Sequence, residues 1–395
     1  MNTPMKKSGE RAVFCTVTLV FYLAHAATAF VAAYLKQIGY TASGAGAVMA
    51  LLNCVGIAAS PVLGNFADRI GSSRRAFITA IVCAGVLMAL CQVCGTAALF
   101  GIPLLSLVLA AWAFFRIPAN SLLDAWTLRR AQESGAFSFG SIRLVGSIAG
   151  ATMCIVYGAL IEKTGTAQTA LLGYSVFAFL AAILCATIGR RADDGGENRG
   201  ASAKKSVGVR AALSCRPFVW FLICHAAMGI PIYDLTTFLP YRLSEMGVSA
   251  GILGVLVAVK SYTEVPMLFW GAKCLKKWDV KKLLSLCFFA FLLEHLACAF
   301  APNVIVVAVA LMAHGLFFGL YLACMTHYVC RITPPEAVAS AQSLLGSAAL
   351  IVAVLGNLVG GPLVDALGAS AFFCLGTGLF ALALGIFAVS SRKAA

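Results

Sequence analysis

The chain has 395 residues, of which 61% are hydrophobic and only 11% charged, and its mean hydropathy is +0.93. Soluble domains contain about 45–50% apolar and about 25% charged residues, so this composition excludes a water-soluble globule. The formal net charge of +14 arises from residues at the ends of apolar runs. It does not form a basic arm with interleaved aromatic residues, which excludes a nucleic-acid-binding protein.

Apolar stretches long enough to cross a bilayer recur from one end of the chain to the other. A hydrocarbon core about 30 Å thick needs about 20 apolar residues in a helix. No segment alternates apolar and polar residues as a membrane barrel does, so we expect helices, which satisfy their own backbone hydrogen bonds in lipid. Cutting at charged and glycine-rich turns predicts an all-α membrane protein with twelve transmembrane helices, at residues 12–35, 43–67, 76–95, 101–127, 141–162, 167–189, 217–242, 250–272, 283–300, 303–329, 339–361 and 370–390.

Lysine and arginine residues set the expected orientation, because cytoplasmic loops carry an excess of them. With both termini in the cytoplasm, 23 of these residues fall on the cytoplasmic side and only three, Lys36, Lys163 and Arg242, fall on the outer side. The sequence therefore predicts a multi-pass protein of the plasma (inner) membrane with cytoplasmic N- and C-termini. We expect it to be a monomer.

One long polar stretch divides the twelve spans into two halves. Residues 189–210 are rich in Arg, Lys, Asp, Gly and Ser, which predicts a flexible cytoplasmic linker. We therefore expect six-helix bundles at residues 1–189 and 217–395, joined by a linker over 190–216. The halves also show a faint repeat, since the run from Gly158 near the end of span five resembles the run from Gly361 near the end of span eleven. Parallel six-helix repeats with a midplane solute site are a known transporter architecture.

The sequence lacks the signatures of an enzyme or a metal site. Most of its fifteen cysteines lie singly inside apolar runs, where cysteine acts as a small hydrophobic residue. Cys91 and Cys94 form a C-x-x-C pair, but no second pair follows as a zinc site would require. No H-E-x-x-H or nucleotide-binding G-x-x-x-x-G-K-[ST] sequence is present. We expect neither enzymatic activity nor a bound metal or cofactor.

The turn after the second span, GNFADRIGSSRR, carries a charged motif between two apolar stretches. It resembles the signature of the major facilitator superfamily, G-x-x-x-D-R-x-G followed by basic residues. The resemblance implies a carrier in which this motif closes the cytoplasmic side in one state and opens in the other. The second-half copy of the motif has Leu275 in place of the aspartate. The matching positions of the first copy are Gly64, Asp68, Arg69, Gly71, Arg74 and Arg75.

Spans four and five show a narrower resemblance. The sequences PANSLLDAW (118–126) and FGSIRLVGS (139–147) are similar to the branch that contains lactose permease and phenylpropionate permease, which are proton symporters. In that branch an acid late in span four and an arginine early in span five bind substrate, which implies these roles for Asp124 and Arg143. His314 fits a histidine of span ten in lactose permease, but Phe317 stands where the glutamate would fall. Lactose is therefore not the expected substrate.

Seven acidic or basic residues fall inside the membrane, with five histidines as neutral candidates; the seven are Arg116, Asp124, Arg143, Asp234, Lys260, Glu264 and Glu294. An ionisable side chain at bilayer depth costs about 2.5–3.5 kcal/mol on insertion scales, so each is a candidate functional residue. We expect substrate binding by Asp124, Arg143, Arg116, Lys260, His314 and Tyr233, and proton coupling by Glu264, Asp234 and Glu294.

Each of these assignments has a structural alternative. Lys260 and Glu264 are four residues apart and share a helix face, so they could simply neutralise one another. Asp124 and Arg143 could form a static salt bridge between consecutive spans. Asp234 could pair with Lys260 or carry a proton itself. Glu294 and its neighbour His295 could serve packing alone.

The sequence predicts a secondary active transporter that works by alternating access and carries a small organic solute together with protons. The resemblance implies sugars, nucleosides or aromatic acids as the solute. Two alternatives stay open, a proton-antiport exporter of drugs or metabolites and a non-transporting membrane sensor on the same fold. The expected partners are the small-molecule solute, protons and the lipid bilayer.

Overall fold

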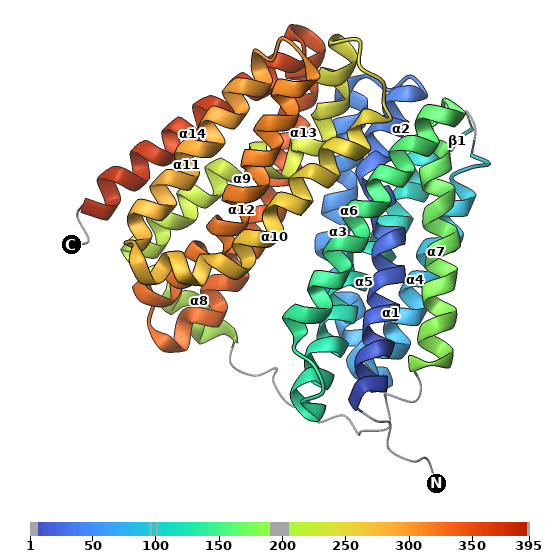
Figure 1. Cartoon of the computed structure of the whole chain (residues 1–395), viewed down its shortest axis with the longest axis horizontal. Helices are drawn as coiled ribbons and strands as arrows, with labels where there is room; N and C mark the ends of the chain where they lie inside the picture. Colours follow the sequence, from blue (N-terminus) through green and yellow to red (C-terminus); the bar gives the residue numbers. More distant parts are fainter. Residues whose placement is uncertain (1–6, 95–96, 100–101, 190–204, 393–395) are drawn as a thin grey trace. The chain divides into compact units, whose positions relative to one another are not determined.

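The computed structural model describes residues 7–94, 97–99, 102–189 and 205–392. Within these ranges the chain is almost entirely helical (Figure 1). The β-structure found there is one short antiparallel pair, β1 (Ala98–Leu99) and β2 (Ile102–Pro103). The chain divides into two compact units. Unit 1 contains Met1–Tyr34 and Leu51–Arg199, and unit 2 contains Leu35–Ala50 and Gly200–Ala395.

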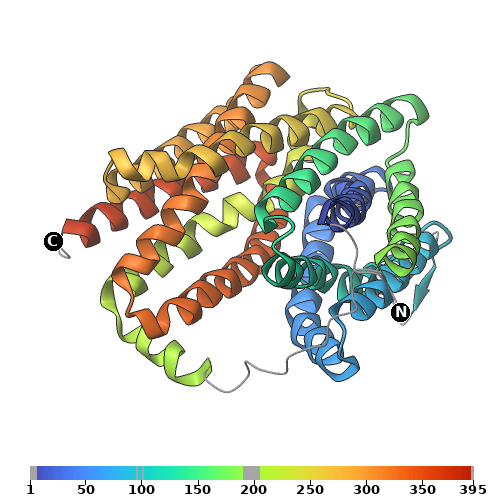
Figure 2. The ribbon, with the colours of Figure 1, turned by 60° about the horizontal axis from the view of Figure 1, so that its bottom comes forward.

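In unit 1, α1 packs against α6 and α7, and α4 packs against α5 and α7. Figure 2 shows α1, in dark blue, nearly end-on beside these neighbours. The helices of this unit are α1 (Lys7–His25), the 3-10 helix η1 (Ala26–Phe30), the start of α2 (Val31–Gln37), most of α3 (Ala42–Ile70), α4 (Ser73–Leu90), α5 (Leu104–Ser134), α6 (Phe139–Thr164) and α7 (Gln168–Thr187).

In unit 2, α12 packs against α10 and α11, while α9 packs against α13 and α14. Phe221, Phe288, Phe291 and Tyr321 lie in its apolar core. The helices of this unit are α8 (Lys205–Ser214), α9 (Arg216–Glu245), α10 (Ile252–Lys277), α11 (Val280–Ala299), α12 (Val304–Ile332), the 3-10 helix η3 (Pro335–Ala337), α13 (Val338–Leu367) and α14 (Ala369–Arg392).

The described part of the chain has eleven helices that are long and apolar enough to cross a membrane, or twelve when α10 is included. The two parts of α10, Ile252–Met267 and Trp270–Lys277, meet at 52°. Large apolar side chains such as Ile183 and Val359 remain more than half exposed on the outer faces of these helices. Such surfaces suit a lipid environment, so the structure supports a multi-pass membrane protein.

Several boundaries differ from the sequence-based expectation, and two of these differences change the kind of structure expected. The third span was expected to reach residue 95, but α4 ends at Leu90 and is followed by a turn. The expected flexible linker over 190–216 lies partly outside the described residues, since 190–204 are not among them. Its later part forms helix α8, in which Ala212 is fully buried against the core of unit 2.

The start of α3 packs within unit 2, although the sequence assigned residues 1–189 to one bundle. Both carboxylate oxygens of Asp365, near the end of α13, accept hydrogen bonds of 2.8 Å from the backbone N–H groups of Ala42 and Ser43. The first turn of a helix has unpaired N–H groups and a positive dipole end, so a carboxylate there is stabilising. A methyl group on Gly361 would clash with the backbone of Ser43, so glycine permits the approach. These contacts explain why residues at the start of α3 belong to unit 2.

Candidate functional site

A chain of polar side chains runs through unit 1, contributed by α1, η1, α5 and α6. Arg116, Asn120 and Asp124 are spaced four residues apart and therefore share one face of α5. The other members come from the facing helices. We call this set the unit 1 polar chain: Tyr22, His25, Thr28, Arg116, Asn120, Asp124 and Arg143.

Tyr22 joins the two ends of the predicted acid–arginine pair. Its hydroxyl donates a hydrogen bond of 2.8 Å to Asn120 Oδ1, and Asn120 Nδ2 donates one of 3.4 Å to Asp124 Oδ2. The Arg143 guanidinium lies 4.8 Å from the centre of the Tyr22 ring, a cation–π distance. A Cβ on Gly146 would lie 2.5 Å from this ring, so the glycine opens a notch in α6 for Tyr22. The structure thus links Asp124 and Arg143 through Tyr22 and Asn120.

Arg116 occupies the other part of the unit 1 polar chain. Its Nη2 lies 3.4 Å from His25 Nε2 and from Thr28 Oγ1, and its guanidinium lies 5.5 Å from the Trp112 ring centre. Its Nε is buried and has no hydrogen-bond partner among the described residues. The partners of this cation are neutral groups, which leaves it able to bind an anionic or hydrogen-bond-accepting part of a solute.

Unit 2 contains a fully buried carboxylate shared by two imidazoles. Glu294 Oε2 lies 2.9 Å from His295 Nδ1 and 2.9 Å from His314 Nδ1, and all three side chains are essentially inaccessible to solvent. We call these residues the Glu294 cluster. Aromatic rings surround it, with Phe291 5.3 Å from His314 and Phe380 4.9 Å from His295 between ring centres. In this apolar setting the hydrogen bonds to the carboxylate are strong, and an unpaired charge would be costly.

The Glu294 cluster keeps unused hydrogen-bonding atoms. Glu294 Oε1 and the Nε2 atoms of His295 and His314 have no partner among the described residues. The Lys260 ammonium interacts electrostatically with Glu294 and with Glu264, its neighbour one turn along α10. A Cβ on Gly315 would clash with the Lys260 carbonyl, so glycine brings α12 directly onto α10. Predicted residues from both categories, Lys260, His314, Glu264 and Glu294, therefore converge in one region of unit 2.

Asp234 has a different partner from the one considered at the level of sequence. Its side chain is fully buried, and its Oδ1 accepts a 2.5 Å hydrogen bond from Asn357 Nδ2 on α13. The described residues show no ion pair between Asp234 and Lys260, because the packing of α9 against α13 points the carboxyl group toward Asn357. Tyr233 beside it is 38% exposed, so the two neighbouring side chains differ in environment.

The signature motif forms the turn between α3 and α4. Gly71 has φ +65°, a left-handed conformation that favours glycine, and the Ser72 side chain accepts a hydrogen bond from Arg75 N to begin α4. Arg74 is buried, and its Nη1 donates to the Cys185 carbonyl at 3.1 Å near the end of α7. A cation at a helix C-terminus is stabilising, so Arg74 ties α4 to α7. Asp68 and Arg69 are exposed at the end of α3, and Gly64 lies about one turn before Asp68.

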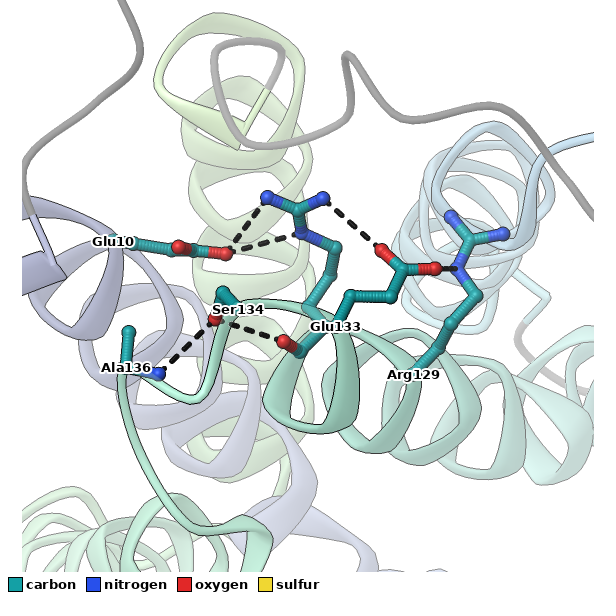
Figure 3. A network of polar contacts seen from close by, with 6 residues as sticks. Glu10, Arg129, Glu133, Ser134 and Ala136 are labelled. Carbon is teal, nitrogen blue, oxygen red and sulfur yellow. Dashed lines mark hydrogen bonds and ion pairs between the residues drawn. The ribbon is translucent and has the colours of Figure 1, made fainter.

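A second set of charges lies where α1 begins and α5 ends (Figure 3). Arg130 Nη2 lies 2.9 Å from Glu10 and Arg130 Nη1 3.1 Å from Glu133, while Arg129 Nε lies 3.6 Å from Glu133. The backbone then turns at Gly135, which has φ +58°. Each charge in this network has an opposite partner, so we assign it to holding α1 and α5 together.

Several neutral members of these sites could not be recognised from charge alone. Tyr22 and Asn357 received no role, Asn120 was noted only within a motif, and His295 was considered only with Glu294. An uncharged amide or phenol in a span attracts less notice because it costs less in lipid than an ion does. The rarity of amide and phenol side chains in apolar runs is the feature of the sequence that could have identified them.

Comparison with known proteins agrees with this fold. Residues 15–375 match the model of the MFS_1 like family. The chain belongs to this family of major facilitator transporters. The protein is therefore a membrane transporter and not an enzyme.

Two kinds of relative can be compared with this transporter. It is 24% identical over 243 residues to the uncharacterized transporter YwbF of Bacillus subtilis (strain 168), a match that spans 61% of this chain and 59% of that protein. The nucleoside transporter NupG has a TM-score of 0.77 at 15% identity, with 97% of this chain and 98% of NupG covered. A bacterial homologue of the iron transporter ferroportin has a TM-score of 0.73 at 13% identity, covering 97% and 98%. At these identities the two structures show the fold alone.

The unit 1 polar chain predicts unequal effects of two substitutions at Tyr22. Tyr22→Phe keeps the ring beneath Arg143 and removes one hydrogen bond, which should cost about 1 kcal/mol. Tyr22→Ala also empties the notch at Gly146, which should cost about 3–5 kcal/mol. Thermal unfolding of the purified variants in detergent measures the difference. Equal melting temperatures for the two variants would contradict the placement of the ring.

Proposed function

We propose that this transporter imports a small organic solute together with protons by alternating access. The observation that carries the proposal is the Glu294 cluster, a carboxylate at hydrogen-bond distance from two imidazoles inside an apolar core. Carboxyl and imidazole groups exchange protons near neutral pH, and buried ionisable groups in membrane spans mark ion and proton pathways. The free atoms Glu294 Oε1 and His314 Nε2 are places where a transported proton can be accepted.

Unit 1 supplies the groups that we assign to the solute. The unit 1 polar chain offers guanidinium donors from Arg116 and Arg143, an acceptor in Asp124 and aromatic surface from Tyr22. Guanidinium groups suit a carboxylate or a base carbonyl, while a carboxylate suits hydroxyl groups. Three solute classes carry such groups: sugars, nucleosides and aromatic acids. We place nucleosides first because NupG, a nucleoside transporter, has the same fold over nearly the whole chain.

This proposal moves Lys260 and His314, which were expected from the sequence to bind substrate, to the proton site in unit 2. Lys260 and Glu264 lie beside the Glu294 cluster, where they can adjust its charge when a proton arrives. Asp234 is held by Asn357 and is a second candidate proton carrier. We assign Tyr233 to the solute because it is exposed, and the motif at Gly64, Asp68, Arg69, Gly71, Arg74 and Arg75 to the cytoplasmic gate.

Solute identity can be found by a binding screen. Sugars, nucleosides and aromatic acids are added to the purified protein, and the melting temperature is recorded for each. We expect one class to raise it, and Arg143→Ala to abolish that rise because the guanidinium contacts the solute. Arg129→Gln, which removes a cation from the ion-pair network at the start of α1 and the end of α5, is the control and should keep the rise. Loss in both variants would point to a general fold effect, and an unchanged rise in Arg143→Ala would remove Arg143 from the site.

Proton coupling predicts a selective defect in Glu294→Gln. The amide cannot carry the transported proton but still accepts a hydrogen bond from an imidazole. We expect this variant, reconstituted in liposomes, to exchange labelled solute with unlabelled solute at a normal rate and to lose accumulation driven by a proton gradient. Full accumulation by Glu294→Gln would contradict the assignment. An exporter would instead show solute leaving right-side-out vesicles in exchange for protons, and a sensor would show no solute flux at all.

A further inference from the structure

A groove on the outer surface of unit 2 runs between the start of α9 and the end of α14. It encloses about 1220 Å³. Apolar side chains form its walls, including Trp220 and Ile223 from α9 and Leu382 and Val389 from α14. Each of these four side chains is at least 42% exposed. The groove is therefore an open apolar channel in the surface and not part of the packed core.

We expect lipid to cover this groove. Both α9 and α14 are long and apolar enough to cross the bilayer, and only 33% of the most apolar window of α14 is buried inside the protein. An acyl chain is apolar and linear, so it can lie along a channel between two antiparallel helices. Gly385 lines the groove and faces open space, since a Cβ at this position would meet no atom within 4 Å, so a large side chain there would project into the channel.

One end of the groove carries positive charge. Arg216, the first residue of α9, lines the groove, is exposed and forms no ion pair within the described residues. At the same end of α14, Lys281 Nζ donates a 2.9 Å hydrogen bond to the Ser391 carbonyl, which leaves two of its three donors for another group. Trp220 lies one turn from Arg216, as expected for an aromatic residue at a membrane interface. An anionic headgroup complements this end of the groove.

We propose that the groove binds one anionic phospholipid, with an acyl chain between α9 and α14 and the phosphate at Arg216 and Lys281. The site is separate from the unit 1 polar chain and from the Glu294 cluster, so it does not depend on the proposed transport activity. By the orientation that the positive residues predict, this lipid belongs to the cytoplasmic leaflet.

Trp220 provides a direct readout. The protein is placed in phosphatidylcholine nanodiscs with increasing amounts of brominated phosphatidylglycerol, which quenches nearby tryptophan fluorescence. Subtracting the fluorescence of the Trp220→Phe variant from that of the unchanged protein leaves the fluorescence of Trp220. We expect quenching to saturate at a low mole fraction of the anionic lipid and not to do so with brominated phosphatidylcholine. Equal quenching by both lipids, rising in proportion to their mole fraction, would show bulk lipid only and overturn the proposal.

Two pairs of variants separate the headgroup from the acyl chain. Arg216→Gln should raise the half-saturating mole fraction about fivefold, as expected for one interfacial cation, while Lys277→Gln, an exposed cation of α10 outside the groove, should not. Gly385→Leu should fill the channel and abolish saturable quenching. Gly378→Leu is the matched control on α14. A Cβ on Gly378 would also face open space, but this residue does not line the groove. Unchanged saturation in both Arg216→Gln and Gly385→Leu would refute the site.

Discussion

Ionisable side chains inside apolar helices are the constraint on which this structure depends. A charge in hydrocarbon is stable only when nearby groups replace its water. Glu294 meets this demand with two imidazoles at 2.9 Å, and Asp234 meets it with the amide of Asn357. Arg143 lies over the Tyr22 ring. The partners are on other helices in most of these cases, so the charges also determine which helices pack together.

Glycine makes these pairings possible. Helices in lipid associate through close packing and hydrogen bonds, and small residues let their surfaces approach. Gly146 admits the Tyr22 ring, and a Cβ on Gly376 would lie 2.4 Å from the His295 ring. Replacing either glycine would therefore move a polar side chain out of its site.

The two units differ in the charges of their candidate site residues. The unit 1 polar chain has two cations and one acid, which suits solute binding. The charged candidates of unit 2 are three acids, Asp234, Glu264 and Glu294, and one cation, Lys260, which suits proton binding.

Much of this architecture could be predicted from the sequence. Span positions follow from hydrophobicity and length, and the GNFADRIGSSRR turn identifies the superfamily. Ionisable residues such as Arg116, Asp124 and Glu294 stand out because they are rare in apolar runs. Their partners could not be predicted, since a contact such as Asp234 with Asn357 joins residues 123 positions apart. Helix α8 could not be predicted because its sequence is polar and mixed, and the contact between the start of α3 and Asp365 could not be predicted because Asp365 lies far along the chain.

The central claim is that solute and protons move together through this protein. Its most direct test uses the purified chain in liposomes that contain a pH-sensitive dye, with no imposed gradient and with labelled solute of the class found by binding. The account predicts that the interior acidifies at a rate proportional to solute entry. Solute entry with no change in internal pH, or with alkalinisation, would contradict it.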